Sequence, residues 1–511
     1  MGARPLSSDP PRPEVVERLI GEAVASRIAD RDPTVWPTAA RPGWVAAARA
    51  ARPLVGEIEG LRERHRVAGR VRVVVAAAGG VGIAAEALAG VDPQLGASRL
   101  IVLDTTDPAQ VADAVAGDLA ATVLVVSAPA GEDTAAVELV RDTVHDALRA
   151  DGLDPAEHTV VVTAPDGPLL RSAGRATVVL GPPDVDGPWA ALTAYALVPA
   201  GLAGTDVAAV LADAIPAADD LASDDPDNPA LRLGALLAQA QVVALAGDDA
   251  PGMAEWAAQL VAAGLGKHGR GPLPVVVEGP DAPEWTAAGV LAAGLGAVPG
   301  AAVAGTGSPA AQMVLWQHAT AVAAHLLGVD PTDRPDAGGT GTDIDTGTGT
   351  DDGTGERLAF RDGGIDVHAG SWLPSGTATV GDALRALLDG GACLSVHAYL
   401  DRLEDASAAV LRAELARRTG RAVAFGWAPR CLPGTGQRDK GGPADTVVCQ
   451  LTGTAEPDLP PDLPPALEAY QQAQARTDAA ALAQRGRPVL RLHFTDRVAG
   501  LVTLARAVQQ L

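Results

Sequence analysis

Short runs of β-branched residues alternate along the chain with longer segments in which charged residues recur among Ala and Leu. One series between 70 and 183 reads RVRVVVAAAGG, RLIVLDTTDP, ATVLVVSAPAG, HTVVVTAP and ATVVLGPP. A second series reads QVVALAG, LPVVVEG, AAVAGTG, CLSVHAYLD, AVAFGW, TVVCQLTG and VLRLHFTD. Uncharged strands separated by helical segments are typical of parallel sheets covered by helices. The pattern predicts an α/β fold with two tandem doubly wound domains.

The same pattern predicts how the chain is divided. Residues 1–60 should be helical, 61–220 should form the first domain, 221–450 the second, and 451–511 should pack across the pair. Between 331 and 357 the chain reads PTDRPDAGGTGTDIDTGTGTDDGTGER, a low-complexity acidic composition that predicts a disordered insertion in the second domain. The spacing of its aspartates matches no calcium-binding loop, so no metal site is predicted there.

The charge and the cysteine content of the chain limit the kinds of ligand and partner that it can be expected to bind. The chain has 63 acidic and 39 basic residues and a formal net charge of −24, and no basic cluster offsets it. Such a surface repels nucleic acid and anionic membranes, although it can equally serve only to keep the protein in solution. Three cysteines argue against a disulfide framework, and no metal-binding cluster is evident. Without a secretory signal or a spanning segment, a cytoplasmic protein is expected.

Several segments, taken in order, resemble one family. They include VAAAGGVGIAAEAL, VVSAPAGEDTAAVE, DVDGPWAALTAYALVPAGLAG, AEWAAQLVAAGLGKHGRGPLPVVVEGPD, AAQMVLWQHATAVAAHLLGVDP and TGRAVAFGWAPRCLPGTGQRDKGGP. The chain from about 57 to 511 resembles glucose-6-phosphate isomerase of the actinobacterial type, which is also the isomerase half of transaldolase–isomerase fusions. The resemblance implies two sugar-isomerase (SIS) domains and a carbohydrate-derivative site between them. It implies reversible conversion of glucose 6-phosphate to fructose 6-phosphate, in glycolysis and gluconeogenesis, without metal or organic cofactor.

The stretch that should hold the phosphate departs from the family pattern. The resemblance places substrate contacts at Gly79–Gly80 and at the loop from Ser127 through Gly131 to Thr134. The family loop supplies hydroxyls and a lysine, whereas Glu132 and Asp133 stand where threonines are expected. A unit charge about 5 Å from a phosphate costs roughly 3 kcal/mol at an effective dielectric near 20, which exceeds what helix amides return. The sequence therefore predicts that this loop repels phosphate unless the two carboxylates turn outward.

Other expected groups are also replaced. Val81 stands for a serine and Pro188, after Gly187, stands for the arginine beside the reacting carbons. Gln317 follows Trp316 where an acid is expected, and an amide is no general base. Ala263–Gly264 replaces a Glu-Ser pair, and Asp439 replaces a histidine before Lys440.

The positions of the lysines, in contrast, indicate that part of the family's site is retained. Among 39 residues that are Lys or Arg, only Lys267 and Lys440 are lysines, and both fall in family motifs. A lysine in an arginine-rich chain suggests that a compact ammonium is wanted, although a packed lysine of suitable length is the alternative. The predicted site is Lys440 as catalytic residue, with substrate contacts at Gly79, Gly80, Ser127, Gly131, Thr134, Gly187, Lys267 and Gln437. Histidines His318, His325 and His397 are interpreted as structural.

These observations leave three functions open. The chain is an isomerase of this family with weakened activity, an inactive SIS-fold paralogue that binds a sugar phosphate, or a regulatory partner of another enzyme. A sugar phosphate or an analogue is the expected ligand, and a homodimer stays open.

Overall fold

The computed structural model describes residues 12–38, 41–90, 100–185, 187–247, 252–335, 356–455, 459–460 and 463–511, and their strands form three sheets. The first sheet has five parallel strands in the order β2–β1–β3–β4–β5. These strands are β1 (Arg72–Ala77), β2 (Leu100–Leu103), β3 (Thr122–Ala128), β4 (Thr159–Thr163) and β5 (Thr177–Leu180). β3 is buried along its whole length, as expected for a strand covered on both faces.

The remaining strands divide between two sheets. A four-stranded parallel sheet has the order β7–β6–β8–β9, and a six-stranded mixed sheet has the order β10–β11–β15–β14–β12–β13. The former contains β6 (Val242–Gly247), β7 (Leu273–Val276), β8 (Val290–Leu295) and β9 (Val303–Gly305). The latter contains β10 (Arg357–Asp362), β11 (Ile365–Ala369), β12 (Cys393–Tyr399), β13 (Ala422–Trp427), β14 (Thr446–Gly453) and β15 (Val489–Phe494). Its strands β15, β14, β12 and β13 are parallel, and the β10–β11 hairpin joins β15 in antiparallel fashion.

Helices cover these sheets, and many of them begin with Pro after a capping Asp, Asn or Ser. The helices up to residue 240 are α1 (Pro13–Gly21), α2 (Val24–Ala29), α3 (Ala47–Ala50), α4 (Leu54–Val67), α5 (Val81–Ala89), α6 (Pro108–Ala116), α7 (Ala135–Ala150), α8 (Pro155–His158), α9 (Pro168–Ser172), α10 (Ala194–Ala203), α11 (Val207–Asp220) and α12 (Pro229–Gln239). Those that follow are α13 (Met253–Leu265), α14 (Pro309–Leu327), α15 (Val380–Leu388), α16 (Ser407–Thr419), α17 (Gln437–Gly441), α18 (Ala466–Gln484) and α19 (Arg497–Gln509).

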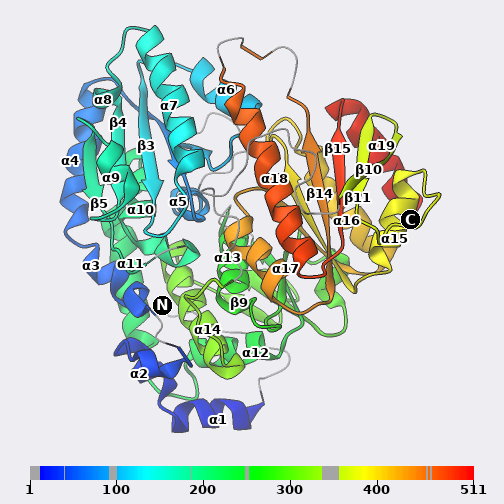
Figure 1. Cartoon of the computed structure of the whole chain (residues 1–511). Coiled ribbons are helices and arrows are strands. Elements are labelled where there is room, and N and C mark those ends of the chain that lie inside the picture. Colours follow the sequence, from blue (N-terminus) through cyan, green and yellow to red (C-terminus); the bar gives the residue numbers. More distant parts are fainter. Residues whose placement is uncertain are drawn as a thin grey trace.

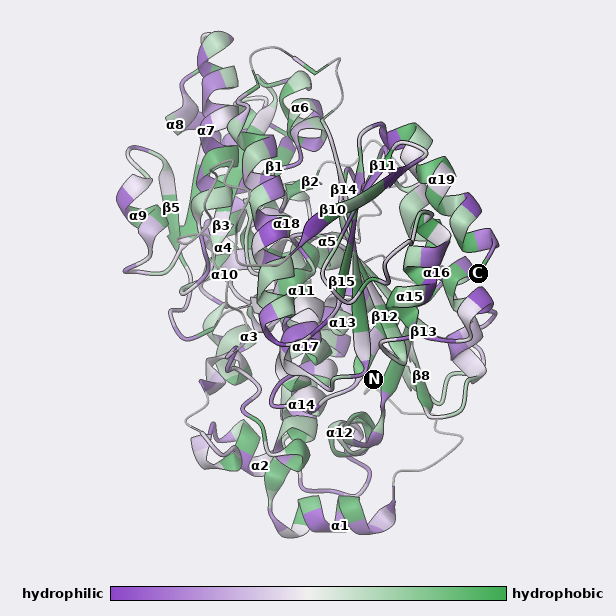
Figure 2. Ribbon diagram, turned by 45° about the vertical axis from the view of Figure 1, so that its right-hand side comes forward, coloured by the Kyte–Doolittle hydropathy of each residue, from purple (hydrophilic) through white to green (hydrophobic). Residues whose placement is uncertain are grey.

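Helix α18 lies between the first sheet and the six-stranded sheet (Figure 1). Leu467 on α18 belongs to the hydrophobic core of the first sheet, and Asp478 on the same helix accepts a hydrogen bond from Gln450 of β14 at 3.1 Å. One helix therefore packs against two sheets that are far apart in the chain. The last strand of the first sheet ends at Leu180, and the first strand of the six-stranded sheet begins at Arg357. In Figure 2 the buried strands β12, β13 and β14 are largely hydrophobic, while helices carry alternating hydrophilic and hydrophobic bands.

The expected α/β class with parallel sheets flanked by helices is confirmed. All twelve predicted strand segments are strands, and helices occur in the N-terminal region as predicted. The sequence interpretation missed β8, whose residues VLAAGL lack the β-branched run, and the β10–β11 hairpin. The predicted domain boundaries stay a prediction. However, the strands expected in one second domain lie in two sheets, and β15 lies within the six-stranded sheet.

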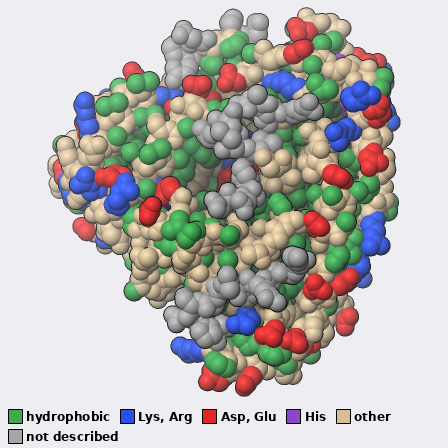
Figure 3. All heavy atoms as spheres, turned by 180° about the vertical axis from the view of Figure 1, so that it is seen from behind, with side chains coloured by type: hydrophobic (Ala, Val, Ile, Leu, Met, Phe, Trp, Pro, Cys, Tyr) green, Lys and Arg blue, Asp and Glu red, His purple; other side chains and the backbone are tan. Residues whose placement is uncertain are grey.

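The predicted insertion at 331–357 lies mostly outside the described residues, which resume at 356. On the face seen in Figure 3, basic side chains lie scattered among acidic ones rather than gathered into a patch. Among the residues that the structure describes, no helix combines the length and the hydrophobicity that crossing a bilayer requires.

Candidate functional site

Three loops of the first sheet converge beyond the carboxyl ends of its strands. Gly79 and Gly80 follow β1 with φ of 70° and 79°, a backbone conformation that favours glycine, and they open α5. A Cβ built on Gly79 would lie 2.6 Å from the carboxyl carbon of Glu132, which belongs to the loop after β3. A Cβ on Gly187 would lie 4.0 Å from the carbonyl oxygen of Gly79. The three loops therefore lie close together at one edge of the first sheet.

A cavity of about 500 Å³ lies at this edge of the sheet. Gly79, Gly80 and Gly131 form one wall, and Asp104 and Thr105, which follow β2, form another. The opposite side is built from 332–334, from 429–433, from Lys440 on α17, and from Gln474 and Asp478 on α18. The carboxyl ends of parallel strands are where ligands bind in open α/β sheets. We take this cavity as the candidate active site.

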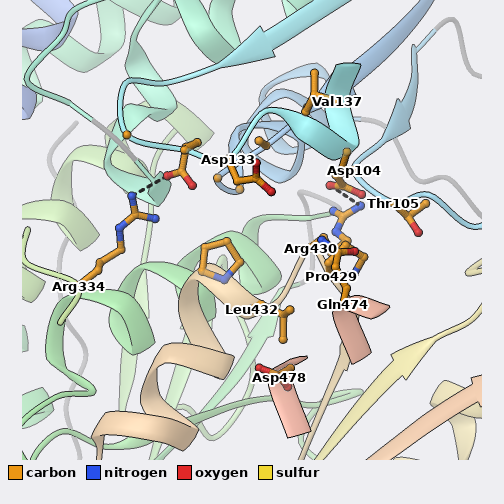
Figure 4. Close-up of a pocket in the computed structure, with 18 of the residues that line it drawn as sticks. Asp104, Thr105, Asp133, Val137, Arg334, Pro429, Arg430, Leu432, Gln474 and Asp478 are labelled. Carbon is orange, nitrogen blue, oxygen red and sulfur yellow. Dashed lines mark ion pairs between the residues drawn. The ribbon is translucent and has the colours of Figure 1, made fainter. Parts of the chain in front are cut away.

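Glu132 forms an ion pair across one side of this cavity. Its Oε1 lies 2.7 Å from Nη2 of Arg334, and the two side chains are only 9% and 15% exposed (Figure 4). The carboxylate does not turn outward but faces a guanidinium from residues 331–335. That cation could not be foreseen from the composition of the segment, which predicts a solvated insertion. That this loop repels phosphate stays a prediction.

Asp133 is also engaged. Its Oδ1 accepts a hydrogen bond from the backbone N–H of Ala135 at 3.0 Å, and its Oδ2 accepts one from the hydroxyl of Tyr470 on α18 at 2.9 Å. The first bond satisfies a free amide at the start of α7, and the second fixes α18 to the loop. Asp133 thus has a structural explanation.

A second ion-paired group centres on Arg430, whose side chain is 2% exposed. Its guanidinium contacts Glu86 at 2.7 Å, Glu255 at 3.0 Å and the cavity residue Asp104 at 3.4 Å (Figure 4). Arg402 also pairs with Glu86. Burial raises the pKa of Asp104 and of Glu255. Burial acts to raise the pKa of Glu86 too, but the two guanidiniums bring it to about 2.

A third group places Lys440 at the cavity. Its Nζ lies 2.5 Å from Oδ1 of Asp478, whose Oδ2 lies 3.5 Å from Nδ1 of His397. Nε2 of His397 lies 2.9 Å from Asp439, which also accepts a hydrogen bond from Ser395. Burial acts to lower the pKa of His397, but the hydrogen bonds to the two aspartates raise it to about 9. His397 is buried as predicted, yet it carries charge in a chain of alternating charges that ends at the cavity.

The structure separates the predicted site residues into two sets. Gly79, Gly80, Gly131 and Lys440 line the cavity, and Gly187 lies beside Arg334, 3.7 Å from its Nη1 when a Cβ is added. Ser127, Thr134, Lys267 and Gln437 are buried and do not line the cavity.

Two residues of the second set have clear structural partners. The hydroxyl of Ser127 donates to the carbonyl oxygen of Tyr195 at 2.9 Å. Nζ of Lys267 donates to the carbonyl oxygen of Asp330 at 2.8 Å and to that of Asp333. Lys267 therefore holds the stretch that carries Arg334. The binding roles predicted for this set stay predictions.

The positions that replace catalytic groups are packed into the interior. Gln317 donates to the carbonyl oxygen of Trp189 at 2.9 Å, and Val81 is 1% exposed. A Cβ on Gly264 would lie 2.5 Å from Cγ2 of Thr320, so that position has no room for a larger side chain. These substitutions are therefore integrated into packing.

Two cations that border the cavity, Arg334 and Arg430, were not predicted from the sequence. Arg334 and Arg430 are among 39 basic residues and belong to none of the positions where an arginine was expected. The signal that could have found Arg430 is its place after the strand AVAFGW, a few residues before α17, which carries Lys440. Arg334 offered no such signal.

Part of the chain is similar in sequence to known proteins. It is 35% identical over 187 residues to a probable glucose-6-phosphate isomerase of Haloarcula marismortui, covering 34% of this chain and 42% of that protein. It is 34% identical over 211 residues to one of Natronomonas pharaonis, covering 38% and 48%. It is 31% identical over 198 residues to the glucose-6-phosphate isomerase of Rubrobacter xylanophilus, covering 36% and 45%. Over this part of its length, the chain is homologous to glucose-6-phosphate isomerases.

The similarity to these relatives covers only part of each protein. The aligned region spans less than half the length of these curated relatives, and no protein-family profile matches the chain. A solved glucose-6-phosphate isomerase of Chlamydia trachomatis superposes with a TM-score of 0.49 at 15% identity, covering 63% of this chain and 80% of that one. Within the described ranges, the chain has no group of three or more His, Cys, Asp or Glu arranged to hold a metal.

Proposed function

We propose that this glucose-6-phosphate isomerase homologue binds a sugar phosphate in the cavity beyond β1 and β3 and isomerises it slowly or not at all. The binding half of the proposal is supported by one observation above the others. The two glycine-bearing loops, Gly79–Gly80 and Gly131, line a cavity of about 500 Å³ at the strand ends, as ligand sites of such sheets do.

The weak turnover follows from the proton-transfer groups. Moving a proton between neighbouring sugar carbons needs a carboxylate or imidazole with a suitable pKa beside the substrate. Two carboxylates at the cavity are held by cations. Burial raises the pKa of Asp104, but its Oδ2 lies 3.4 Å from Nη1 of Arg430. Burial also acts to raise the pKa of Asp478, but Lys440 and His397 hold that pKa well below its usual range. Gln317 cannot act as a base. Slow chemistry in a preserved cavity is the reading that these contacts support.

The test combines calorimetric titration with glucose 6-phosphate and a coupled assay for conversion of fructose 6-phosphate. We expect measurable binding and turnover below about one per second, the lower end of ordinary enzymes. Ala136, which lines the cavity at the start of α7, provides a blocking variant, and its neighbour Ala135, which does not line it, provides the matched control. Ala136→Phe should abolish binding and Ala135→Phe should retain it.

Two outcomes contradict the proposal in different ways. Turnover at tens per second or more would show an intact enzyme with a base that we have not assigned. Binding that survives Ala136→Phe would place the ligand elsewhere. A regulatory partner role has no specific observation in its favour.

A further inference from the structure

The carboxylate of Glu132 fills the space above the Gly79–Gly80 turn. A Cβ on Gly79 would meet both the carboxyl carbon and Oε1 of Glu132 at 2.6 Å. The side chain is 9% exposed, so this is a seated conformation rather than a solvent-facing one. The turn opens α5, where partial positive charge from free amides favours an anion. The chain thus places its own anion at the head of the cavity.

The stretch that carries the cation facing Glu132 is held independently of Glu132. Arg334 belongs to a stretch that Lys267 fixes through the carbonyl oxygens of Asp330 and Asp333. Thr332 in the same stretch donates from its backbone N–H to Asp330 at 2.8 Å. Because these bonds do not involve Glu132, the backbone that carries Arg334 should keep its position when the carboxylate leaves. The arginine therefore stays anchored at the cavity wall, with its guanidinium within reach of an anion.

We propose that the Glu132–Arg334 pair is an internal stopper of a phosphate site, and that a phosphate monoester binds by displacing the Glu132 carboxylate from Arg334. The ligand class is a phosphate monoester or inorganic phosphate, because a guanidinium receives phosphate oxygens in pairs as it does carboxylate oxygens. This inference rests on the proposed function, since it assigns the phosphate end of the same cavity.

The stopper makes the site weak without removing it. A tethered carboxylate competes at a high effective concentration, so the fraction of molecules with Arg334 accessible to ligand is small. The apparent affinity for ligand falls by that fraction. Removing the charge of Glu132 removes the competitor and leaves the cation in place. Removing Arg334 as well should remove the gain, which simple relief of repulsion would not require.

The experiment measures inorganic phosphate binding by calorimetry to the wild-type chain and three variants. We expect Glu132→Gln to bind at least tenfold more tightly than wild type, and the double variant Glu132→Gln with Arg334→Gln to lose that gain. Asp133→Asn is the matched control, because it removes the same charge one residue away where the carboxylate is bound to Ala135 and Tyr470. Its gain should stay below threefold.

Each outcome separates the two proposals. Equal gains in Glu132→Gln and Asp133→Asn, no gain in Glu132→Gln, or a gain that survives loss of Arg334 would overturn the stopper. If Glu132→Gln binds inorganic phosphate as expected while wild type neither binds nor converts glucose 6-phosphate, the stopper stands and the proposed function fails. If Glu132→Gln does not fold, judged by circular dichroism, Glu132→Ser serves in the same design.

Discussion

His397 carries a positive charge inside the protein because two carboxylates face it. Asp439 lies 2.9 Å from one ring nitrogen and Asp478 lies 3.5 Å from the other. Lys440 neutralises the far side of Asp478, so the four groups alternate in charge. The pKa of His397 rises from 6.5 to about 9. Folding therefore binds a proton more tightly at this residue than the unfolded chain does.

This residue should make stability depend on pH in a defined window. The contribution of His397 is fully present below pH 6.5, where both states are protonated, and is lost as pH rises through about 9. The difference in pKa corresponds to about 3 kcal/mol of unfolding free energy. Urea unfolding between pH 6.5 and 9 should show this decline in wild type and a flatter profile in His397→Gln.

The matched control is His318, another buried histidine. Burial lowers its pKa to about 4, so it stays neutral throughout the window. His318→Gln should keep the wild-type slope even if it lowers stability as a whole. Equal slopes in wild type and His397→Gln would show that His397 is not charged in the folded protein.

Lys440 and His397 also show which properties of single residues could be predicted from the sequence and which could not. Lys440 was predicted at the site because it lies in a family motif and is one of only two lysines in the chain. The structure places it in the lining of the cavity. The charge on His397 was not predicted, because its partners lie 42 and 81 residues away on α17 and α18 and only the fold brings them together. Local motifs locate loops, whereas ion pairs between distant elements need the fold.

At the scale of elements, the stretch 330–334 gains its shape from a residue on another segment. Lys267 follows α13, is fully buried and donates to two carbonyl oxygens of this stretch. A hydrogen bond from a charged donor contributes about 1.5–3 kcal/mol, and an abandoned buried carbonyl adds to the loss. Lys267→Met should therefore lower the unfolding free energy by about 3 kcal/mol or more, measured by denaturant titration.

Arg270 supplies the control for this change. It also donates to a carbonyl oxygen, that of Leu327, but its side chain belongs to an exposed residue. Water can replace that bond, so Arg270→Met should cost less than about 1 kcal/mol. Similar losses in the two variants would mean that Lys267 does not hold the stretch that carries Arg334.

Elements differ in how visible they were in the sequence. β3 was predictable because TVLVVSA is a continuous apolar run that is buried on both faces. β8 escaped because VLAAGL owes its strand conformation to pairing with β6 and β9 rather than to its own residues. The packing of α18 against two sheets was likewise not visible, since no local pattern specifies which sheets a helix contacts.

At the scale of the whole molecule, buried ion pairs join the part of the chain around the first sheet to the part around the six-stranded sheet. Arg430 and Arg402 from the C-terminal part meet Glu86 on α5. Arg497, at the start of α19, meets Asp107 after β2 at 3.0 Å and Asp405 at 2.9 Å. These contacts fix the walls of the cavity relative to each other, since the cavity is built from both parts.

Arg497 allows this connection to be tested on one helix. Its side chain is 4% exposed, and replacing it leaves Asp107 and Asp405 buried without their shared cation. Breaking a buried pair in this way typically costs about 3–5 kcal/mol. Arg497→Gln should lower the unfolding free energy by that amount, whereas Arg506→Gln, exposed on the same helix, should change it by less than about 1 kcal/mol. Because the two sheets share the cavity, Arg497→Gln should also weaken glucose 6-phosphate binding in calorimetry, even below the temperature at which it unfolds. A variant that loses no more stability than Arg506→Gln, and binds as wild type does, would show that the ion pairs of Arg497 are not needed to hold the two parts in place.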